Sequence, residues 1–170
     1  METTYVPELS SAADRLLLDE ASPLLGGAVA VVDAGDVALA LAGRVDELRV
    51  SNDSAEDSAG SELSLADAAT GADVVLFRLP KSLDRFDDIA REVAIHARPT
   101  VTLLAAGRLK YMTLGMNEVL ARSFDNVRAS LARQKSRVLV ASQPILVARP
   151  VPRRVHLDDL DLDIVAWGGV

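Results

Sequence analysis

Short apolar runs that end in polar or proline-containing corners recur along the chain. The central run is residues 73–79, DVVLFRL, in which β-branched and aromatic residues follow an acid. Such a run predicts a buried strand. Pro80 ends the strand because it has no N–H to donate to a ladder, and Ser82 can cap a following helix. The apolar positions of that helix recur at helical spacing: Leu83, Phe86, Ile89, Ala90 and Val93.

The same alternation of apolar runs and amphipathic segments covers most of the chain. Residues 54–72 differ, because they are rich in Ser, Ala and acids and predict only a loop with one short helix. Elsewhere the pattern predicts buried strands separated by helices, which is typical of a parallel sheet. The predicted strands are 28–33, 47–51 and 101–106, and the predicted helices are 9–20, 37–42 and 113–123.

The pattern changes after residue 126. Residues 127–132 alternate between apolar and polar side chains, and residues 136–141 form another apolar run. The short connection between them, residues 133–135, indicates an antiparallel pair at one edge of the sheet. The predicted fold is therefore α/β, with a mostly parallel Rossmann-like sheet, helices on both faces and an antiparallel edge hairpin.

The composition restricts the chemistry of the protein. With 170 residues the chain predicts one domain, and 49% hydrophobic but only 4% aromatic residues predict a core of Ala, Val and Leu. The absence of cysteine excludes disulfides and thiolate chemistry, and two histidines, His96 and His156, argue against a histidine-based metal site. No signal-like start and no run of about 18 apolar residues occur. We therefore expect a cytoplasmic protein with no membrane partner.

Charge is distributed unevenly along the chain. Residues 1–77 carry 3 Lys and Arg against 15 Asp and Glu, residues 78–154 carry 15 against 6, and residues 155–170 carry four Asp. An anionic partner responds to a local patch rather than to the net charge of −7. The basic middle segment therefore predicts such a partner. The alternative is that the three segments interleave in space and cancel.

Polar residues at the ends of the predicted strands mark two candidate sites. Asp33 and Asp53 follow strands about 20 residues apart, as in a nucleotide-binding βαβ unit. However, residues 33–36 (DAGD) hold one glycine and two carboxylates, which argues against a phosphate-binding loop and leaves a neutral or cationic cofactor as the alternative. The second candidate is basic, and its residues follow two strands and the hairpin turn: Arg78, Lys81, Arg108, Lys110, Arg133 and Lys135.

Three segments carry a resemblance to a known family: DVVLFRLPKSLDRFDDIAREV, TVTLLAAGRLKYMT and ARQKSRVLVAS. Together they resemble the N-terminal domain of bacterial ribosomal RNA guanine-N2 methyltransferases of the two-domain type, over roughly residues 10–145. The resemblance implies a degenerate class I methyltransferase fold in this half. It also implies a C-terminal half that binds S-adenosylmethionine and catalyses methyl transfer to ribosomal RNA.

Three departures from a catalytic methyltransferase domain stand out. Residues 53–73 are too few for the helix and strand that a complete methyltransferase sheet has there, no Asn-Pro-Pro-aromatic tetrad occurs, and no glycine-rich loop follows Val32. We therefore expect no catalytic residue and no cofactor in this chain, with Asp33 and Asp53 as vestiges of a cofactor site. Residues 1–145 are predicted to form the degenerate domain, and residues 146–170 a linker and the start of a missing catalytic domain.

The leading interpretation is a non-catalytic domain that binds ribosomal RNA through the six basic residues and supports the catalytic half. One alternative is a protein-interaction scaffold. Another is a domain that itself binds S-adenosylmethionine at Asp33 and Asp53 and methylates RNA. The end of the chain is predicted to pack against the missing half through a cluster of apolar side chains: Leu160, Leu162, Ile164, Val165 and Trp167.

Overall fold

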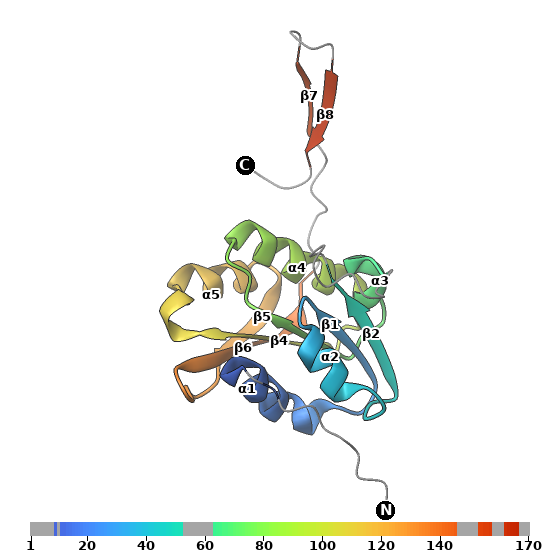
Figure 1. Ribbon diagram of the computed structural model, residues 1–170. Coiled ribbons are helices and arrows are strands. Elements are labelled where there is room, and N and C mark those ends of the chain that lie inside the picture. The colour runs from blue at the N-terminus through green and yellow to red at the C-terminus, as the bar shows by residue number, and fades with distance from the viewer. Residues whose placement is uncertain (1–8, 10, 53–62, 146–152, 158–161, 167–170) are drawn as a thin grey trace, which may run out of the picture.

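The computed structural model describes residues 9, 11–52, 63–145, 153–157 and 162–166, and its main feature is a six-stranded sheet (Figure 1). The strand order is β2-β1-β3-β4-β6-β5. Strands β1 to β4 are parallel, and β6 runs antiparallel to both β4 and β5. The predicted mixed sheet is confirmed. Its strands are β1 (Ala28–Val32), β2 (Glu47–Ser51), β3 (Val74–Arg78), β4 (Thr102–Arg108), β5 (Phe124–Ala129) and β6 (Ser136–Pro144).

Helices cover both faces of the sheet, as Figure 1 shows. Helices α1 (Ala12–Ala21) and α2 (Gly35–Leu41) pack on one face, and α3 (Leu65–Ala69), α4 (Leu83–His96) and α5 (Leu114–Ala121) on the other. Successive side chains of a strand point to opposite faces. In β3, Leu76 accordingly joins the α1 side of the core and Phe77 joins the α4 side. Both faces are buried, which explains why the central strands read as continuous apolar runs.

Helix α4 begins as its sequence predicts. The Ser82 hydroxyl accepts a hydrogen bond of 3.3 Å from the Arg85 backbone N–H, and four of the five predicted apolar positions are buried. The fifth, Leu83, is 44% exposed. Leu83 is the first residue of the helix.

The edge hairpin is longer than predicted. Strand β5 starts at Phe124, whose ring is buried, three residues before the alternation indicated. The exposed Asp125 and Asn126 hide the period-two pattern at this end, because an edge strand has one solvated face. After β5 the backbone N–H of Ser130 still donates to the carbonyl of Val138 (2.8 Å), which extends the pairing towards the turn.

Near the end of the chain, β7 (Arg153–Leu157) and β8 (Leu162–Ala166) form a separate antiparallel sheet. The boundary predicted at residue 145 stays a prediction, since residues 146–152 lie outside the described part. The same holds for the packing predicted for the apolar cluster, and for Leu160 and Trp167 in particular. Among the described residues, no helix is long and apolar enough to cross a membrane.

Candidate nucleic-acid interface

Three basic segments meet at the carboxyl edge of the parallel strands. The backbone N–H of Leu79, just after β3, donates to the carbonyl of Ala106 in β4 (2.8 Å). The N–H of Leu109, just after β4, donates to the carbonyl of Lys135 in the β5–β6 turn (2.9 Å). Backbone hydrogen bonds therefore join the corner after β3, the end of β4 and the hairpin turn. Strands β3 and β4 are parallel neighbours, so the basic residues that follow them lie on one edge.

A glycine allows this close approach. A Cβ atom added at Gly107 would lie 2.6 Å from Cδ1 of Leu79, closer than real side chains come. Only glycine at this position lets β4 continue unhindered past the Leu79 side chain to Arg108. Because Gly107 has no side chain, the Leu79-Pro80 corner can pack directly against the end of β4.

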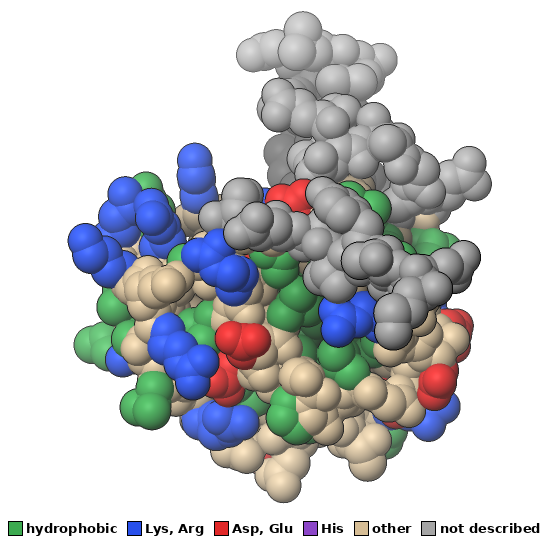
Figure 2. Space-filling model, turned by 60° about the horizontal axis from the view of Figure 1, so that its bottom comes forward, with side chains coloured by type: hydrophobic (Ala, Val, Ile, Leu, Met, Phe, Trp, Pro, Cys, Tyr) green, Lys and Arg blue, Asp and Glu red, His purple; other side chains and the backbone are tan. Residues whose placement is uncertain are grey.

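A hollow of about 350 Å³ opens at this edge, lined by Arg108, Leu109, Lys110 and Lys135. The three cationic side chains are exposed, and none of them has an ion pair with an acid of the described residues. Figure 2 shows Lys and Arg side chains gathered on the left of the molecule, the side on which Figure 1 places α5 and the β5–β6 turn. Cationic side chains without an ion-pair partner around a hollow can bind the oxygens of an anionic ligand.

Lys81 belongs to the same edge. It is exposed in the corner between β3 and α4, and it has no ion pair with a described acid. The Lys110 ammonium, as hydrogen-bond donor and as positive charge, lowers the pKa of the Tyr111 phenol, and the charges of Arg108 and Lys81 lower it further. The corner that holds Lys81 is joined to β4 by the hydrogen bond from Leu79 to Ala106, two residues before Arg108. Four of the six predicted basic residues come together here: Lys81, Arg108, Lys110 and Lys135.

Tyr111 is the residue that sequence reasoning missed. It ends a short 3-10 helix, η2 (Leu109–Tyr111), and is 63% exposed. The ammonium of Lys110 lies over its ring, 4.6 Å from the ring centroid. An aromatic residue beside a lysine in a basic loop, as in the run GRLKY, is the signal that could have found it.

Arg78 is held differently from the other cations. Its guanidinium donates two hydrogen bonds to the buried carboxylate of Asp14 on α1, one of them from Nε to Oδ1 at 2.8 Å. It also donates a hydrogen bond of 3.4 Å to the carboxylate of Asp36. The hydrogen bond to Asp14 raises the pKa of Arg78. This pair ties α1 to the end of β3. The structure thus gives Arg78 a structural contact, and the RNA contact predicted for it stays a prediction.

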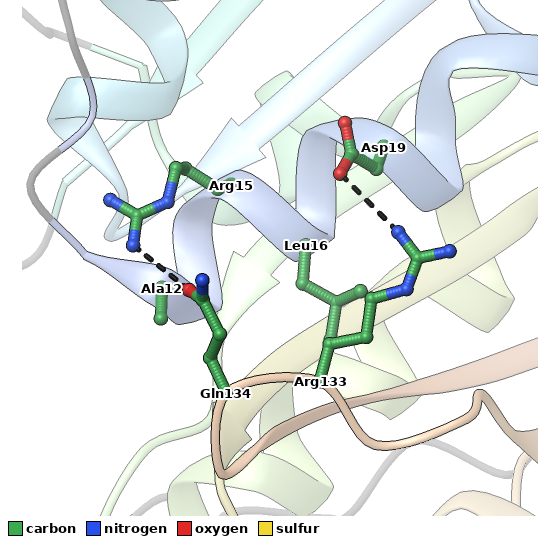
Figure 3. A pocket seen from close by; sticks show the side chains of 6 residues that line it. All are labelled: Ala12, Arg15, Leu16, Asp19, Arg133 and Gln134. Atoms are coloured by element: carbon green, nitrogen blue, oxygen red, sulfur yellow. Dashed lines mark hydrogen bonds and ion pairs between the residues drawn. The ribbon is translucent and has the colours of Figure 1, made fainter.

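The Arg133 side chain points towards Asp19 on α1, as Figure 3 shows. Its guanidinium lies 3.8 Å from the carboxylate of Asp19 on α1, and the neighbouring Gln134 accepts a hydrogen bond of 3.1 Å from Arg15. These residues line a second, smaller hollow of about 190 Å³ between α1 and the turn. The structure therefore separates Arg133 from Lys135, although the two are only two residues apart.

The β5–β6 turn places Lys135 through a backbone conformation that favours glycine. Arg133 and Ser136 exchange two backbone hydrogen bonds, of 2.9 and 2.8 Å. Between them, Gln134 and Lys135 have φ angles of 48° and 59°. Two positive φ angles are the mark of a type I′ turn, which usually holds Asn-Gly or Asp-Gly. Residues held in this region point to a functional constraint more often than residues in ordinary turns.

Asp33, one of the two predicted vestigial cofactor residues, forms an ion pair. The carboxylate of Asp33, which follows β1 with φ 49°, lies 3.2 Å from the guanidinium of Arg85 on α4. Asp53 lies outside the described residues. Within the described ranges no group of three His, Cys, Asp or Glu side chains could hold a metal ion.

Comparison with known proteins decides the family. Residues 29–144 match the model of the RLMG N-terminal domain. The chain belongs to this family. The resemblance inferred from the strand, Pro-Lys corner and helix is thereby confirmed.

The curated relatives that this chain matches are longer than the chain itself. The ribosomal RNA large subunit methyltransferase G of Pseudomonas putida (strain W619) is 28% identical over 176 residues, which cover 100% of this chain and 47% of that protein. The protein of the same name from P. putida (strain GB-1) is 32% identical over 101 residues, covering 58% of this chain and 27% of that one. The chain thus spans about half the length of the curated relatives it matches.

Solved structures confirm the fold. The 16S rRNA N2 G1207 methyltransferase of T. thermophilus, solved with AdoMet and guanosine, matches with a TM-score of 0.66 at 16% identity, over 94% of this chain and 46% of that one. Precorrin 8w decarboxylase of Methanobacterium thermoautotrophicum matches with a TM-score of 0.56 at 18% identity, over 84% and 95%. At such identities the likeness shows a shared fold, which is the class I methyltransferase fold predicted from the sequence.

Proposed function

We propose that this RLMG N-terminal domain is the non-catalytic, RNA-binding half of an S-adenosylmethionine-dependent ribosomal RNA guanine-N2 methyltransferase. The observation that carries the proposal is the cluster of exposed cations at the carboxyl edge, Lys81, Arg108, Lys110 and Lys135, with no acid of the described residues paired to them. Phosphate contacts supply most of the affinity of proteins for nucleic acid. The names of the curated relatives indicate that the nucleic acid is ribosomal RNA.

The described corner after β3 supports a non-catalytic role. In the resembled family an Asn-Pro-Pro-aromatic tetrad orients the target amino group and stacks on the base. Here the corresponding corner is Arg78-Leu79-Pro80-Lys81, and the Arg78 guanidinium is held by Asp14. A donor-only side chain that is already paired offers no oxygen to an amino group. We therefore assign methyl transfer and S-adenosylmethionine to a separate catalytic domain.

The partner of this chain within the enzyme is, on this proposal, its own catalytic half. Degenerate copies of a fold bury the faces that the original buries, so the two halves are expected to dock. Strand β8 follows the domain, and the sequence at residues 160–164 (LDLDI) alternates apolar and acidic residues, the pattern of a strand with one packed face. The proposal places the protein in the cytoplasm with the ribosomal RNA that it would contact.

A protein-interaction scaffold is the second candidate, and one observation favours it. Leu114 at the start of α5 and Leu131 beside the hairpin turn are 83% and 84% exposed. Exposed leucines of this kind can anchor a protein partner. Salt dependence separates the two functions, because phosphate contacts release counterions and apolar contacts do not.

The test measures binding of a ribosomal RNA fragment to the 170-residue chain between low and moderate salt. Each phosphate contact contributes about 0.9 to the slope of log affinity against log salt, so Lys81→Gln with Lys110→Gln should lower the slope by about two. The matched control is Arg44→Gln, an exposed arginine between α2 and β2 at the opposite edge of the sheet, which should leave the slope unchanged. Equal slopes for the double variant and the wild type would contradict the proposal.

A further inference from the structure

We propose that Tyr111 is a stacking platform for an unpaired base of the bound RNA, with Lys110 and its neighbours holding the adjoining phosphates. The inference rests on the proposed function and adds the form of the ligand: a single strand or loop rather than a duplex. Its starting point is the exposure of the ring. The other aromatic side chains of the described residues, Phe77, Phe86 and Phe124, are at most 1% exposed, whereas Tyr111 is 63% exposed.

The backbone holds Tyr111 in place beside the hollow. The 3-10 turn that carries it is closed by a hydrogen bond of 3.1 Å from the N–H of Met112 to the carbonyl of Leu109. Leu109 is itself bonded through its N–H to the hairpin turn at Lys135. A ring on a short helix that is closed by its own hydrogen bond and bonded at its start to the hairpin turn costs less entropy to order on binding than a ring on a free loop.

Lys110 connects the ring with the cationic hollow. Its side chain lines the hollow, and its ammonium lies over the Tyr111 ring at 4.6 Å. The hollow, at about 350 Å³, has the volume of a small-ligand site, and Leu109 gives it an apolar wall beside three cations. A nucleotide matches this chemistry, because its phosphate meets the cations while its sugar and base meet Leu109 and the ring.

Stacking on Tyr111 requires the exposed face of a base, and this requirement favours unpaired RNA over a duplex. In a duplex the bases stack on each other and present only their edges in the grooves, whereas unpaired bases can be splayed onto an aromatic side chain. Stacking is tolerant of base identity, since every base has a π face. The proposed ligand is therefore an unpaired segment of RNA, recognised by stacking and phosphate contacts with little sequence preference.

The experiment compares two probes of equal length: an unstructured 12-nucleotide RNA and the same strand annealed to its complement. Binding of the 170-residue chain is followed by fluorescence anisotropy for the wild type, Tyr111→Ala, Tyr111→Phe and Lys110→Gln. Tyr111→Ala should weaken binding of the single strand about 5- to 100-fold and leave its salt slope unchanged, because stacking releases no counterions. Tyr111→Phe keeps the ring and should stay within about threefold of the wild type.

Lys110→Gln is the matched contrast, since it should lower the salt slope for the single strand by about 0.7. A second readout is photocrosslinking with 5-iodouridine in the single strand, where the crosslinked peptide should contain Tyr111. An unchanged affinity of Tyr111→Ala, a wild type that prefers the duplex, or a crosslink that maps elsewhere would overturn the platform. If one of these results is found while binding still weakens steeply with salt, the proposed function stands and only the Tyr111 platform is overturned. A wild type that binds neither probe overturns both the platform and the proposed function.

Discussion

The buried carboxylate of Asp14 on α1 is gripped at two points by the guanidinium of Arg78 at the end of β3, 64 residues further along the chain. Asp14 has no exposed surface, while the Arg78 side chain is 42% exposed. A buried carboxylate without its partner is strongly unfavourable, because the charge has lost its hydration. The pair therefore holds the first helix against the central strand.

Replacement of Arg78 should consequently affect stability more than RNA binding. We expect Arg78→Leu to lower the free energy of unfolding by about 1–3 kcal/mol, the range for a buried polar group that loses a charged partner, reduced here by the exposure of the arginine. Urea unfolding of the 170-residue chain measures it. Lys81→Leu is the control and should stay within about 0.5 kcal/mol of the wild type. Equal stability of the two variants would show that the pair contributes nothing.

We expect Lys135 to lower the stability of the folded chain while its charge contributes to RNA binding. Its φ of 59° is unfavourable for a side chain with a Cβ, so Lys135→Gly should raise the free energy of unfolding by about 0.5–1 kcal/mol. The same variant should lower the salt slope for RNA by about 0.9. Lys135→Ala is the matched control, because it removes the charge and keeps the strained backbone. If glycine and alanine have the same stability, the turn carries no strain.

The phenol of Tyr111 should titrate below the usual tyrosine pKa of 10.0, since the Lys110 ammonium, and less strongly Arg108 and Lys81, stabilise its phenolate. Ultraviolet titration measures this pKa in a Tyr5→Phe background, which leaves Tyr111 as the sole tyrosine. Lys110→Gln should raise the pKa back towards 10.0, and Arg44→Gln should leave it unchanged. A titration curve insensitive to Lys110→Gln would mean that the two side chains do not interact in solution.

S-adenosylmethionine should not bind to this chain. The Asp33 carboxylate is engaged by Arg85, and residues 33–36 offer two carboxylates where a cofactor loop presents bare N–H groups. Isothermal titration calorimetry of the 170-residue chain with S-adenosylmethionine should therefore show no saturable heat. A micromolar dissociation constant would contradict this and favour a domain that methylates RNA by itself.

Local patterns in the sequence are sufficient for most of the fold. The apolar runs 28–33, 73–79 and 101–106, the Ser82 cap and the basic hairpin turn all depend on residues close together in the chain, so periodicity and capping chemistry identify them, although β4 continues to Arg108, two residues beyond the predicted run. Parallel pairing is then expected, because parallel neighbours need a long crossover connection, which is usually a helix. The common edge for Lys81, Arg108 and Lys110 is a consequence of that rule alone.

Only the tertiary structure decided which charges remain unpaired and which aromatic ring stays in solvent. Arg78 and Arg133 look like Lys81 and Lys135 in the sequence, but helix α1 brings Asp14 to the first and Asp19 to the second. Tyr111, at the end of η2 after β4, is 63% exposed. Ion pairing and burial depend on elements that are distant in sequence, whereas strand and helix patterns depend on neighbours.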